Sequence, residues 1–323
     1  MHIHIENDAS GPLALHLSRE MLQQQLDAHP ILRSHFTLTE NSDATQTATF
    51  LANCDVMWSG RKLALDAFTA PRLGWVQVMS AGVEQWLANW REGVMLTNAS
   101  GVHGDKGAEF ILMAALMFNF GIPGFLQDQA QRLWRPTFGG CARGKTVLLL
   151  GVGGIGAAAA NRLTAQGYRV IGVTRSGQCD ADVASCIRID DIDDVLPQVD
   201  VLVSTLPLTP QTNRLFDRRR LDLLPVRAGV VIVGRAAVFD YTSLREKLCA
   251  GELAGAVLDV YPQEPLPIDD ALWNTPGVVM TPHCSLDDHS AYLQGCLDVF
   301  IDNLVRFRSG QPLRNQVDVA RGY

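Results

Sequence analysis

A glycine-rich stretch with the sequence GVGGIG, residues 151–156, restricts the fold of this chain more than any other segment. The apolar run Thr146 to Leu150 precedes it, and the alanine-rich segment Ala157 to Leu163 follows it. Strand, glycine turn and helix is the context in which a G-x-G-x-x-G match predicts dinucleotide binding. Glycines at these positions allow a tight turn, a close approach of a pyrophosphate, and close packing of helix on strand. The alternative is a turn that only packs a helix against a sheet.

The composition is that of an ordinary globular protein. With 323 residues, 47% of them hydrophobic and 19% charged, the chain is long enough for two domains with cores of their own. Its formal net charge of −7 argues against a nucleic-acid partner, which requires a basic face. No uninterrupted apolar stretch approaches the ~20 residues of a membrane span, so we expect no membrane partner.

The cysteines and the first residues both bear on the compartment. Seven cysteines are scattered along the chain without a C-x-x-C pair, which predicts reduced thiols and offers no zinc-site spacing. We therefore expect no metal. The start, MHIHIE, lacks the charged and then apolar pattern of a signal peptide. Together these features favour a cytoplasmic location.

The N-terminal part alternates short strand and helix patterns. We predict strands at His2 to Ile5, Cys54 to Trp58 and Trp75 to Met79. The helical patterns are Arg19 to Ala28 and Leu63 to Phe68. Such alternation predicts a parallel sheet.

Three further segments lie outside that series. Gly107 to Phe120 is nearly all apolar and predicts a buried helix. Gly121 to Cys141 is rich in Gly, Pro and Trp and is expected to be irregular. Ser290 to Arg308 carries apolar residues at helical spacing and predicts a C-terminal helix.

A second series of alternating strands and helices begins at Lys145. It contains six candidate strands: Val147–Leu150, Arg169–Val173, Val199–Ser204, Val230–Val233, Gly255–Val260 and Val278–Thr281. The fold class is therefore α/β, with two doubly wound parallel-sheet domains. One is a Rossmann-type cofactor domain and the other a flavodoxin-like substrate domain.

The end of the strand after the glycine turn indicates which nicotinamide cofactor is bound. A NAD-selective site has an acidic residue there, but this chain has Thr174, followed by Arg175 and Ser176. Arg175 can pair with a 2′-phosphate bidentately, with help from the two hydroxyls. These residues predict NADPH, with NADH as the alternative if Arg175 is only a solvated surface arginine.

Ketone reduction needs a cation for the substrate, a proton donor for the new alkoxide, and a group that keeps the donor charged and aligned. Arg235, Glu264 and His283 supply one of each, and all three follow predicted strands. A carboxylate beside a histidine stabilises its imidazolium form. Taken singly, each residue also has a structural interpretation: a surface charge, a solvated loop residue and a hydrogen-bonded turn residue.

From about Met79 to the C-terminus the chain resembles the D-isomer-specific 2-hydroxyacid dehydrogenase family. The motifs that carry this resemblance are Ala81-Gly82-Val83, the glycine stretch, Leu206 to Thr212, Gly255 to Val260, Glu264 to Pro267, and Thr281-Pro282-His283. Within the family, the ending QVDVARGY and the Thr174-Arg175 pair are similar to the glyoxylate/hydroxypyruvate reductase A branch.

The resemblance implies a role for each matching residue. Arg235 would bind the carboxylate and carbonyl of a 2-keto acid, His283 would donate the proton, and Glu264 would orient and charge it. The implied substrate contacts are Ala81, Gly82, Val83, Arg235, His283 and Trp134. The implied cofactor contacts are Gly151, Gly153, Gly154, Ile155, Gly156, Thr174, Arg175, Ser176, Leu206, Pro207, Thr212, Val233, Gly234 and Asp259. For Trp134 a dimer-interface role without substrate contact is the alternative.

The resemblance also implies a domain arrangement and a partner. Residues 1–98 and 289–323 would form the substrate domain, and residues 99–288 the NAD(P)-binding domain. The chain would form a homodimer through the 121–141 segment. Two departures from the family pattern, Ala236 and the run CSLDD at 284–288, leave the keto acid undetermined.

The leading hypothesis is an NADPH-dependent reductase of small 2-keto acids such as glyoxylate and hydroxypyruvate. One alternative is a cofactor-sensing binding protein on the same fold, like the dehydrogenase-like corepressors. Another 2-hydroxyacid dehydrogenase that uses NADH, or a formate dehydrogenase, is a third hypothesis. The Arg-Glu-His trio favours the leading one.

Overall fold

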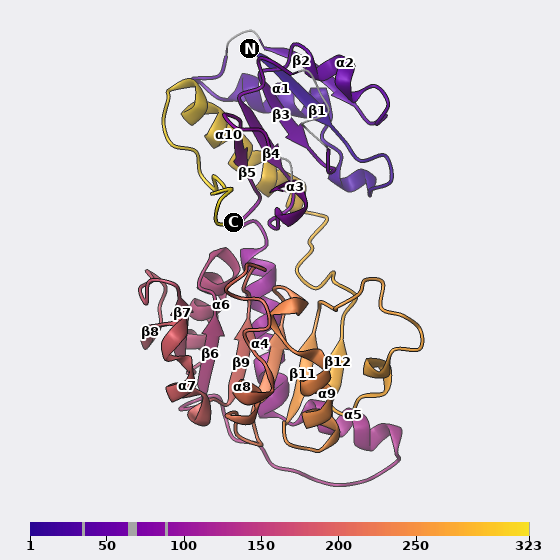
Figure 1. Ribbon diagram of the computed structural model, residues 1–323, viewed down its shortest axis with the longest axis vertical. Helices are drawn as coiled ribbons and strands as arrows, with labels where there is room; N and C mark the ends of the chain where they lie inside the picture. The colour runs from indigo at the N-terminus through magenta and orange to yellow at the C-terminus, as the bar shows by residue number, and fades with distance from the viewer. Residues whose placement is uncertain (34–35, 64–69, 88–89, 323) are drawn as a thin grey trace. The chain divides into compact units, whose positions relative to one another are not determined.

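The computed structural model of the chain describes residues 1–33, 36–63, 70–87 and 90–322 (Figure 1). The chain divides into two compact units. Unit 1 comprises Met1–Val102 and Asp288–Tyr323, and unit 2 comprises His103–Asp287. Each unit has its own sheet.

Unit 1 is built on a parallel sheet with the strand order β2-β1-β3-β4-β5, which is the flavodoxin-like order. Its elements are β1 (His2–Glu6), α1 (Arg19–Ala28), β2 (Thr37–Asn41), α2 (Thr47–Leu51), β3 (Val56–Ser59), β4 (Trp75–Val78), α3 (Glu84–Leu87), β5 (Met95–Thr97) and α10 (Tyr292–Arg308). The predicted strands β1, β3 and β4 are confirmed, as are helices α1 and α10. The helix expected at Leu63 to Phe68 falls almost wholly on residues outside the described part of the chain.

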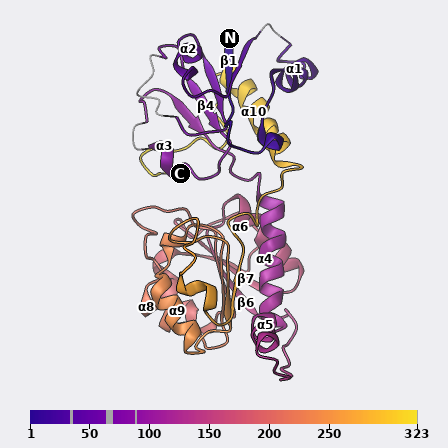
Figure 2. The same ribbon diagram turned by 90° about the vertical axis from the view of Figure 1, so that its right-hand side faces the viewer.

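Helices cover both faces of this sheet, with α1 and α10 on one face and α2 and α3 on the other (Figure 2). Alternate strand residues therefore enter different cores. Trp58 of β3 and Trp75 of β4 pack with Phe300 of α10, whose ring centroid lies 5.4 Å and 5.0 Å from theirs. Met57 and Val76 lie in the core on the opposite face.

Unit 2 is built on a parallel sheet with the order β12-β11-β10-β9-β6-β7-β8. Its elements are α4 (Gly104–Asn119), α5 (Ile122–Ala130), β6 (Thr146–Leu150), α6 (Gly154–Ala165), β7 (Arg169–Thr174), β8 (Ser185–Arg188), α7 (Ile192–Val195), β9 (Val201–Ser204), α8 (Arg218–Asp222), β10 (Gly229–Ile232), α9 (Tyr241–Cys249), β11 (Gly255–Leu258) and β12 (Val278–Met280). Strand order reverses between β6 and β9, and a doubly wound sheet binds its ligand at such a point.

The expectation of six strands in unit 2 was wrong by one. Among the described residues the sheet has seven strands, because β8 extends it beyond β7. The sequence of β8 is SCIR, and all four of its residues remain at least partly exposed. A short polar edge strand has no alternating apolar pattern to reveal it.

Two cores flank the sheet of unit 2. Leu148 and Leu150 of β6 face one core, and Val147 and Leu149 face the other, which also receives buried residues of α4 and α6. In Figure 2, α4 and α6 lie on one side of this sheet and α8 and α9 on the other. Both faces are covered, and so the strands are apolar runs rather than alternating ones.

The 121–141 segment was expected to be irregular throughout, and its first half is helical instead. Gly121 adopts a left-handed φ of 67° and caps α5, which has Pro123 in its first turn. Proline suits that place because the first turn has no partner for its N–H and needs its φ. Only the part after Ala130 lacks regular structure.

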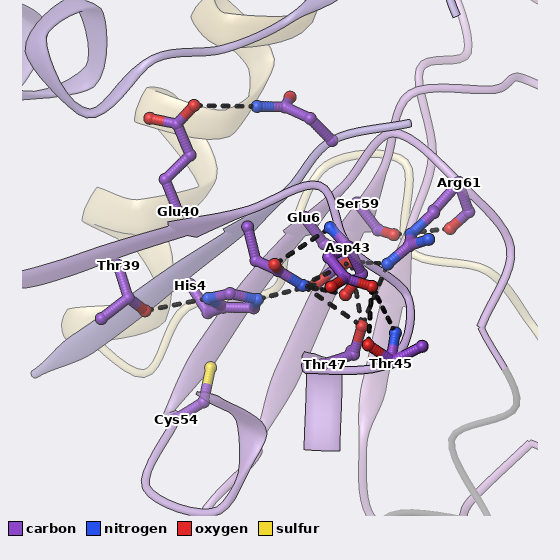
Figure 3. A network of polar contacts seen from close by, with 12 residues as sticks. His4, Glu6, Thr39, Glu40, Asp43, Thr45, Thr47, Cys54, Ser59 and Arg61 are labelled. Atoms are coloured by element: carbon purple, nitrogen blue, oxygen red, sulfur yellow. Dashed lines mark hydrogen bonds and ion pairs between the residues drawn. The ribbon is translucent and has the colours of Figure 1, made fainter. Parts of the chain in front are cut away.

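A buried polar network occupies the carboxyl end of β1 in unit 1 (Figure 3). Glu6 is fully buried, and it bonds His4 at 2.8 Å and Thr47 at 3.0 Å and is paired with Arg61. Arg61 follows β3, so this ion pair fastens the loop after β3 to the carboxyl end of β1. Breaking a buried pair of this kind costs about 3–5 kcal/mol.

Within the part of the chain that the structure describes, no single helix is long and apolar enough to cross a membrane. Helices α4 and α5 satisfy such a test only when they are taken together across the 67° bend between them.

Candidate active site

The three predicted catalytic side chains follow three neighbouring strands. Arg235 comes three residues after β10, Glu264 lies in the loop after β11, and His283 comes three residues after β12. These strands are adjacent and parallel in the sheet of unit 2. Parallel strands end at the same edge, and that edge is where open α/β sheets bind their ligands.

Glu264 and His283 form a hydrogen-bonded pair. His283 Nδ1 lies 2.7 Å from Glu264 Oε2, and the backbone N–H of Tyr261 donates to Glu264 Oε1 at 2.9 Å. About half of the His283 side chain is exposed, at 49%. The pair leaves Nε2 as the ring nitrogen that can serve a substrate, because the carboxylate holds the proton of Nδ1.

The loop that carries His283 is fastened to the end of β11. Asp259 is buried, and its Oδ1 accepts hydrogen bonds from Thr281 Oγ1 at 2.7 Å and from the backbone N–H groups of Cys284 and Ser285, both at 3.2 Å. The Tyr261 hydroxyl lies 2.7 Å from the Thr281 carbonyl oxygen. Burial raises the pKa of Tyr261 to about 12, so this hydroxyl stays protonated and can donate.

The glycine stretch has the local geometry of a dinucleotide turn. Gly151 adopts a left-handed φ of 89°, and a Cβ at Gly156 would lie 2.1 Å from the Gly151 carbonyl oxygen. A Cβ at Gly153 would meet no protein atom within 4 Å, so the space in front of this residue is open. Helix α6 begins at Gly154, and its N-terminus directs backbone N–H groups toward that space. These features fit a pyrophosphate.

Two neighbouring segments complete this edge of the sheet. A Cβ at Gly234 would lie 2.5 Å from the Leu206 carbonyl oxygen, so only glycine permits this approach. Thr212 Oγ1 donates to the Pro207 carbonyl at 2.7 Å and holds the loop after β9 in shape. Residues Leu206, Pro207, Thr212, Val233 and Gly234 are thereby brought to the edge that also bears Arg235.

A tight turn follows β7, and Thr174 organises it. Thr174 Oγ1 accepts hydrogen bonds from the N–H groups of Gly177 at 3.0 Å and Gln178 at 3.2 Å. Arg175 and Ser176 are exposed in this turn. A hydroxyl at the end of β7 thus takes the place of the acidic residue that binds a ribose in NAD-selective sites.

The predicted substrate contacts Ala81, Gly82 and Val83 lie in unit 1, between β4 and α3. Asn98 Nδ2 donates to the Ala81 carbonyl at 2.8 Å, and Ser80 Oγ donates to the Gly82 carbonyl at 2.7 Å. Both side chains fix the orientation of the peptides at this turn. Whether these amides bind a carboxylate stays a prediction.

Trp134 lies beyond α5 in the part of the 121–141 segment without regular structure. Its side chain is 97% exposed, and Phe138 nearby is 94% exposed. Exposed apolar side chains that lie together can mark an interaction surface. Whether Trp134 contacts a substrate stays a prediction.

Known proteins resemble this chain over the range that includes this edge of the sheet. The family model described as "D-isomer specific 2-hydroxyacid dehydrogenase, NAD binding domain" matches residues 112–285, which is more than half of the chain. The chain belongs to the D-isomer-specific 2-hydroxyacid dehydrogenase family. The matched range ends just after His283 and contains the glycine stretch, Arg235 and Glu264.

Individual members of this family are also similar to the chain in sequence and in structure. The chain is 34% identical over 193 residues to glyoxylate/hydroxypyruvate reductase A of Salmonella newport (strain SL254), and the match covers 60% of this chain but only 61% of that relative. A solved family protein from Aeromonas salmonicida subsp. salmonicida A449 is 29% identical, with a TM-score of 0.80 over 98% of this chain and 99% of that one. A second, from Xanthobacter autotrophicus Py2 in complex with NADPH and MES, is 26% identical, with a TM-score of 0.82 over 99% of both chains.

The sequence analysis overlooked Thr205, which lies at this edge of the sheet. Thr205 Oγ1 donates to the Gly151 carbonyl at 2.9 Å and joins the end of β9 to the glycine turn. The signal was present, since a hydroxyl residue directly follows the buried strand Val201–Ser204. No periodicity distinguishes it from an ordinary strand end.

Proposed function

We propose that this chain is an NADPH-dependent reductase that converts small 2-keto acids, such as glyoxylate and hydroxypyruvate, into 2-hydroxy acids. The observation that carries the proposal is the 2.7 Å hydrogen bond between Glu264 and His283 at the strand edge that also bears Arg235. This edge therefore carries a proton donor, the carboxylate that keeps the donor charged, and a protein cation that can bind the substrate's carboxylate. The curated relatives named glyoxylate/hydroxypyruvate reductase A support the substrate class.

His283 serves as the general acid. Glu264 holds the Nδ1 proton, which directs Nε2 toward the substrate and stabilises the imidazolium form. As the carbonyl oxygen gains negative charge, Nε2 donates its proton to it and the imidazole becomes neutral. General acid catalysis of this kind contributes about 10²–10⁴-fold to the rate.

Arg235 binds the substrate. Its guanidinium carries a permanent charge and a fork of donors that suits a carboxylate and the adjacent carbonyl oxygen. Polarising that carbonyl stabilises the developing alkoxide. Gly82 and Val83 are proposed as further contacts of the substrate carboxylate.

The dinucleotide would be held by the glycine stretch, by Asp259 and by the turn after β7. When bound, its nicotinamide supplies the hydride that the carbonyl carbon receives. Thr174, Arg175 and Ser176 form a turn that suits a 2′-phosphate, and a relative from Xanthobacter autotrophicus Py2 is described as a complex with NADPH. NADPH is therefore the proposed cofactor, and NADH is the weaker alternative.

The proposed assembly is a homodimer formed through the 121–141 segment, in the cytoplasm. Exposed Trp134 and Phe138 support the first part of this proposal, because burial of aromatic side chains stabilises interfaces. The cysteines support the proposed cytoplasmic location. All seven are free thiols, and Cys141, Cys249 and Cys284 are exposed, as is usual in a reducing compartment.

The test is a set of initial rates with a panel of small 2-keto acids, measured with NADPH and NADH in parallel. The proposal expects oxidation of NADPH with glyoxylate or hydroxypyruvate at a higher kcat/KM than with NADH. If every keto acid fails while NADPH still binds tightly, the chain is a cofactor-sensing protein instead.

A further inference from the structure

Two cysteines lie together beside the turn that follows β7. Cys186 of β8 lies close enough to Cys179 for the two thiols to interact. The strand register sets Gly172 opposite Cys186, and a Cβ at Gly172 would lie 3.7 Å from Cys179 Sγ. Because Gly172 has no side chain, both thiols share the space beside β7.

This pair is connected to the turn through Thr174. The Thr174 hydroxyl lies 3.6 Å from Cys186 Sγ and 3.1 Å from the Gln178 carbonyl oxygen. Gln178 directly precedes Cys179 in the chain, so each thiol is one contact away from Thr174. A movement of either cysteine therefore changes the turn that carries Arg175.

Both thiols are partly exposed, which allows a small oxidant to reach them. In contrast, Cys54 and Cys296 are fully buried, and burial raises the pKa of each to about 12. Burial also raises the pKa of Cys186, whose thiol consequently stays protonated at neutral pH. Cys186 is therefore a poor first nucleophile, since the thiolate is the reactive form of cysteine, and the first oxidation is assigned to its neighbour Cys179.

We propose that Cys179 and Cys186 form a redox-responsive site, in which a hydroperoxide converts the two thiols into a disulfide and weakens the binding of NADPH. The effect on NADPH rests on the function proposed above, whereas the disulfide itself does not. Intracellular disulfides are commonly transient and redox-sensing, and a pair of neighbouring thiols suits that behaviour.

The chemistry proceeds in two steps. The Cys179 thiol loses its proton, and its sulfur attacks the hydroxyl oxygen of the hydroperoxide. The O–O bond breaks, the other oxygen takes up that proton and leaves as an alcohol or water, and Cys179 becomes a sulfenic acid. Cys186 sulfur then attacks Cys179 sulfur, the S–O bond breaks, and water leaves with the Cys186 proton. Two thiols are oxidised to one disulfide and the hydroperoxide is reduced.

A disulfide bond is shorter than a hydrogen bond between two thiols. Its formation therefore draws Cys179 toward β8 and moves Gln178, whose N–H and carbonyl oxygen both bond Thr174. The hydroxyl of Thr174 loses the geometry that shapes the turn. Recognition of a 2′-phosphate weakens, while NADH, which has none, is affected less.

The experiment treats the purified full-length protein with hydrogen peroxide, alkylates the remaining thiols, and identifies crosslinked peptides by mass spectrometry. In parallel, the Kd for NADPH and for NADH is measured by fluorescence titration, before and after reduction with dithiothreitol. Cys179→Ser and Cys186→Ser remove one thiol each, and Cys249→Ser is the matched control at an exposed cysteine elsewhere.

We expect a Cys179–Cys186 crosslink, an increase of at least fivefold in the Kd for NADPH, a smaller change for NADH, and full reversal by dithiothreitol. The two single variants should resist the change, and Cys249→Ser should behave like the wild type. A missing crosslink, or a crosslink that leaves the Kd for NADPH unchanged, overturns the proposal. Both readouts are independent of turnover, so a failed keto-acid assay affects only the proposed function.

Discussion

His283 combines an exposed side chain with a constrained backbone. Its φ of 50° is left-handed, a conformation that costs a non-glycine residue about 1–3 kcal/mol. The contacts of Asp259 and Tyr261 with the Thr281–Ser285 segment hold it there. These contacts thus offset the cost of the left-handed backbone and fix the position of the imidazole.

Two glycines of the 151–156 stretch should respond differently to alanine. At Gly156 the new Cβ would meet the Gly151 carbonyl oxygen at 2.1 Å, so we expect a loss of about 1–3 kcal/mol in the free energy of unfolding. At Gly153 no protein atom lies within 4 Å of the new Cβ. Gly153→Ala should therefore fold normally but raise the Kd for NADPH at least tenfold.

Chemical denaturation and fluorescence titration of both variants distinguish the two effects. If Gly153→Ala binds NADPH as tightly as the wild type, the pyrophosphate does not lie in the open space before α6. Equal stability of Gly156→Ala and the wild type would mean that the close approach to Gly151 is not required.

Among the elements, the end of β7 is predicted to determine which cofactor is preferred. Replacing Thr174 by Asp puts a carboxylate where a 2′-phosphate is expected, and it also supplies an acceptor for a ribose hydroxyl. We expect the ratio of kcat/KM for NADPH to that for NADH to fall at least 100-fold. Steady-state kinetics with both cofactors gives this ratio. Arg169→Ala, at the other end of β7, is the matched control and should leave it unchanged.

The polar network at the end of β1 predicts loss of stability in acid. Burial alone would raise the pKa of Glu6, but hydrogen bonds from His4, Arg61, Asn41 and Thr47 outweigh it and lower the pKa. Burial also lowers the pKa of His2, against the opposing effect of the Asn53 carbonyl. In both cases the unfolded chain binds more protons than the folded chain, so stability must fall as pH decreases.

The pH window follows from those two directions. The contribution of His2 is lost as pH falls below 6.5, and that of Glu6 as pH falls below 4.5. Thermal unfolding followed by circular dichroism should show a Tm that decreases between pH 7 and pH 4. Glu6→Gln should flatten the lower part of this profile, and a steeper decline in that variant would contradict the assignment.

Elements with a continuous apolar run could be predicted from the sequence, whereas short polar elements could not. The strands from β6 to β12 other than β8 were placed within about two residues at either end, as is usual for such boundaries. The edge strand β2, with the sequence TLTEN, was missed for the same reason as β8, because its residues are mostly polar. In α5, Gly121 and Pro123 were interpreted as loop residues, although proline in a first turn also begins helices.

Part of the candidate site could likewise be predicted from the sequence, and part could not. The pairing of Glu264 with His283 followed from the residue types after successive strands, since parallel strands end at one edge. The clamp formed by Tyr261, Asp259 and Thr281 did not, because it depends on the path of two loops. Contacts between loop backbones and side chains leave no periodic signal in a sequence.

At the scale of the whole molecule, each sheet is parallel and covered on both faces, and the family match lies mainly on unit 2. The curated relatives align over only about three fifths of their own length, whereas the solved relatives align over nearly all of it. The substrate of this chain must therefore be measured on this protein itself.

The proposed homodimer can be tested by removing the exposed aromatic side chains of the 121–141 segment. Replacing both Trp134 and Phe138 by Ser removes two aromatic side chains that are almost fully exposed in one chain. Sedimentation velocity should show a dimer for the wild type and a monomer, or a Kd at least 100-fold weaker, for the double variant. Ile268→Ser, at another residue that is 97% exposed, is the control and should remain dimeric. A monomeric wild type would contradict the assembly.

We propose above that His283, held by Glu264, protonates a 2-keto acid. The most direct measurement compares kcat for glyoxylate, with NADPH, between the wild type and His283→Asn, together with the Kd for NADPH of each. We predict a loss of about 10²–10⁴-fold in kcat with an unchanged Kd, as expected when a general acid is removed. A His283→Asn variant that reduces glyoxylate at the wild-type rate would contradict the claim.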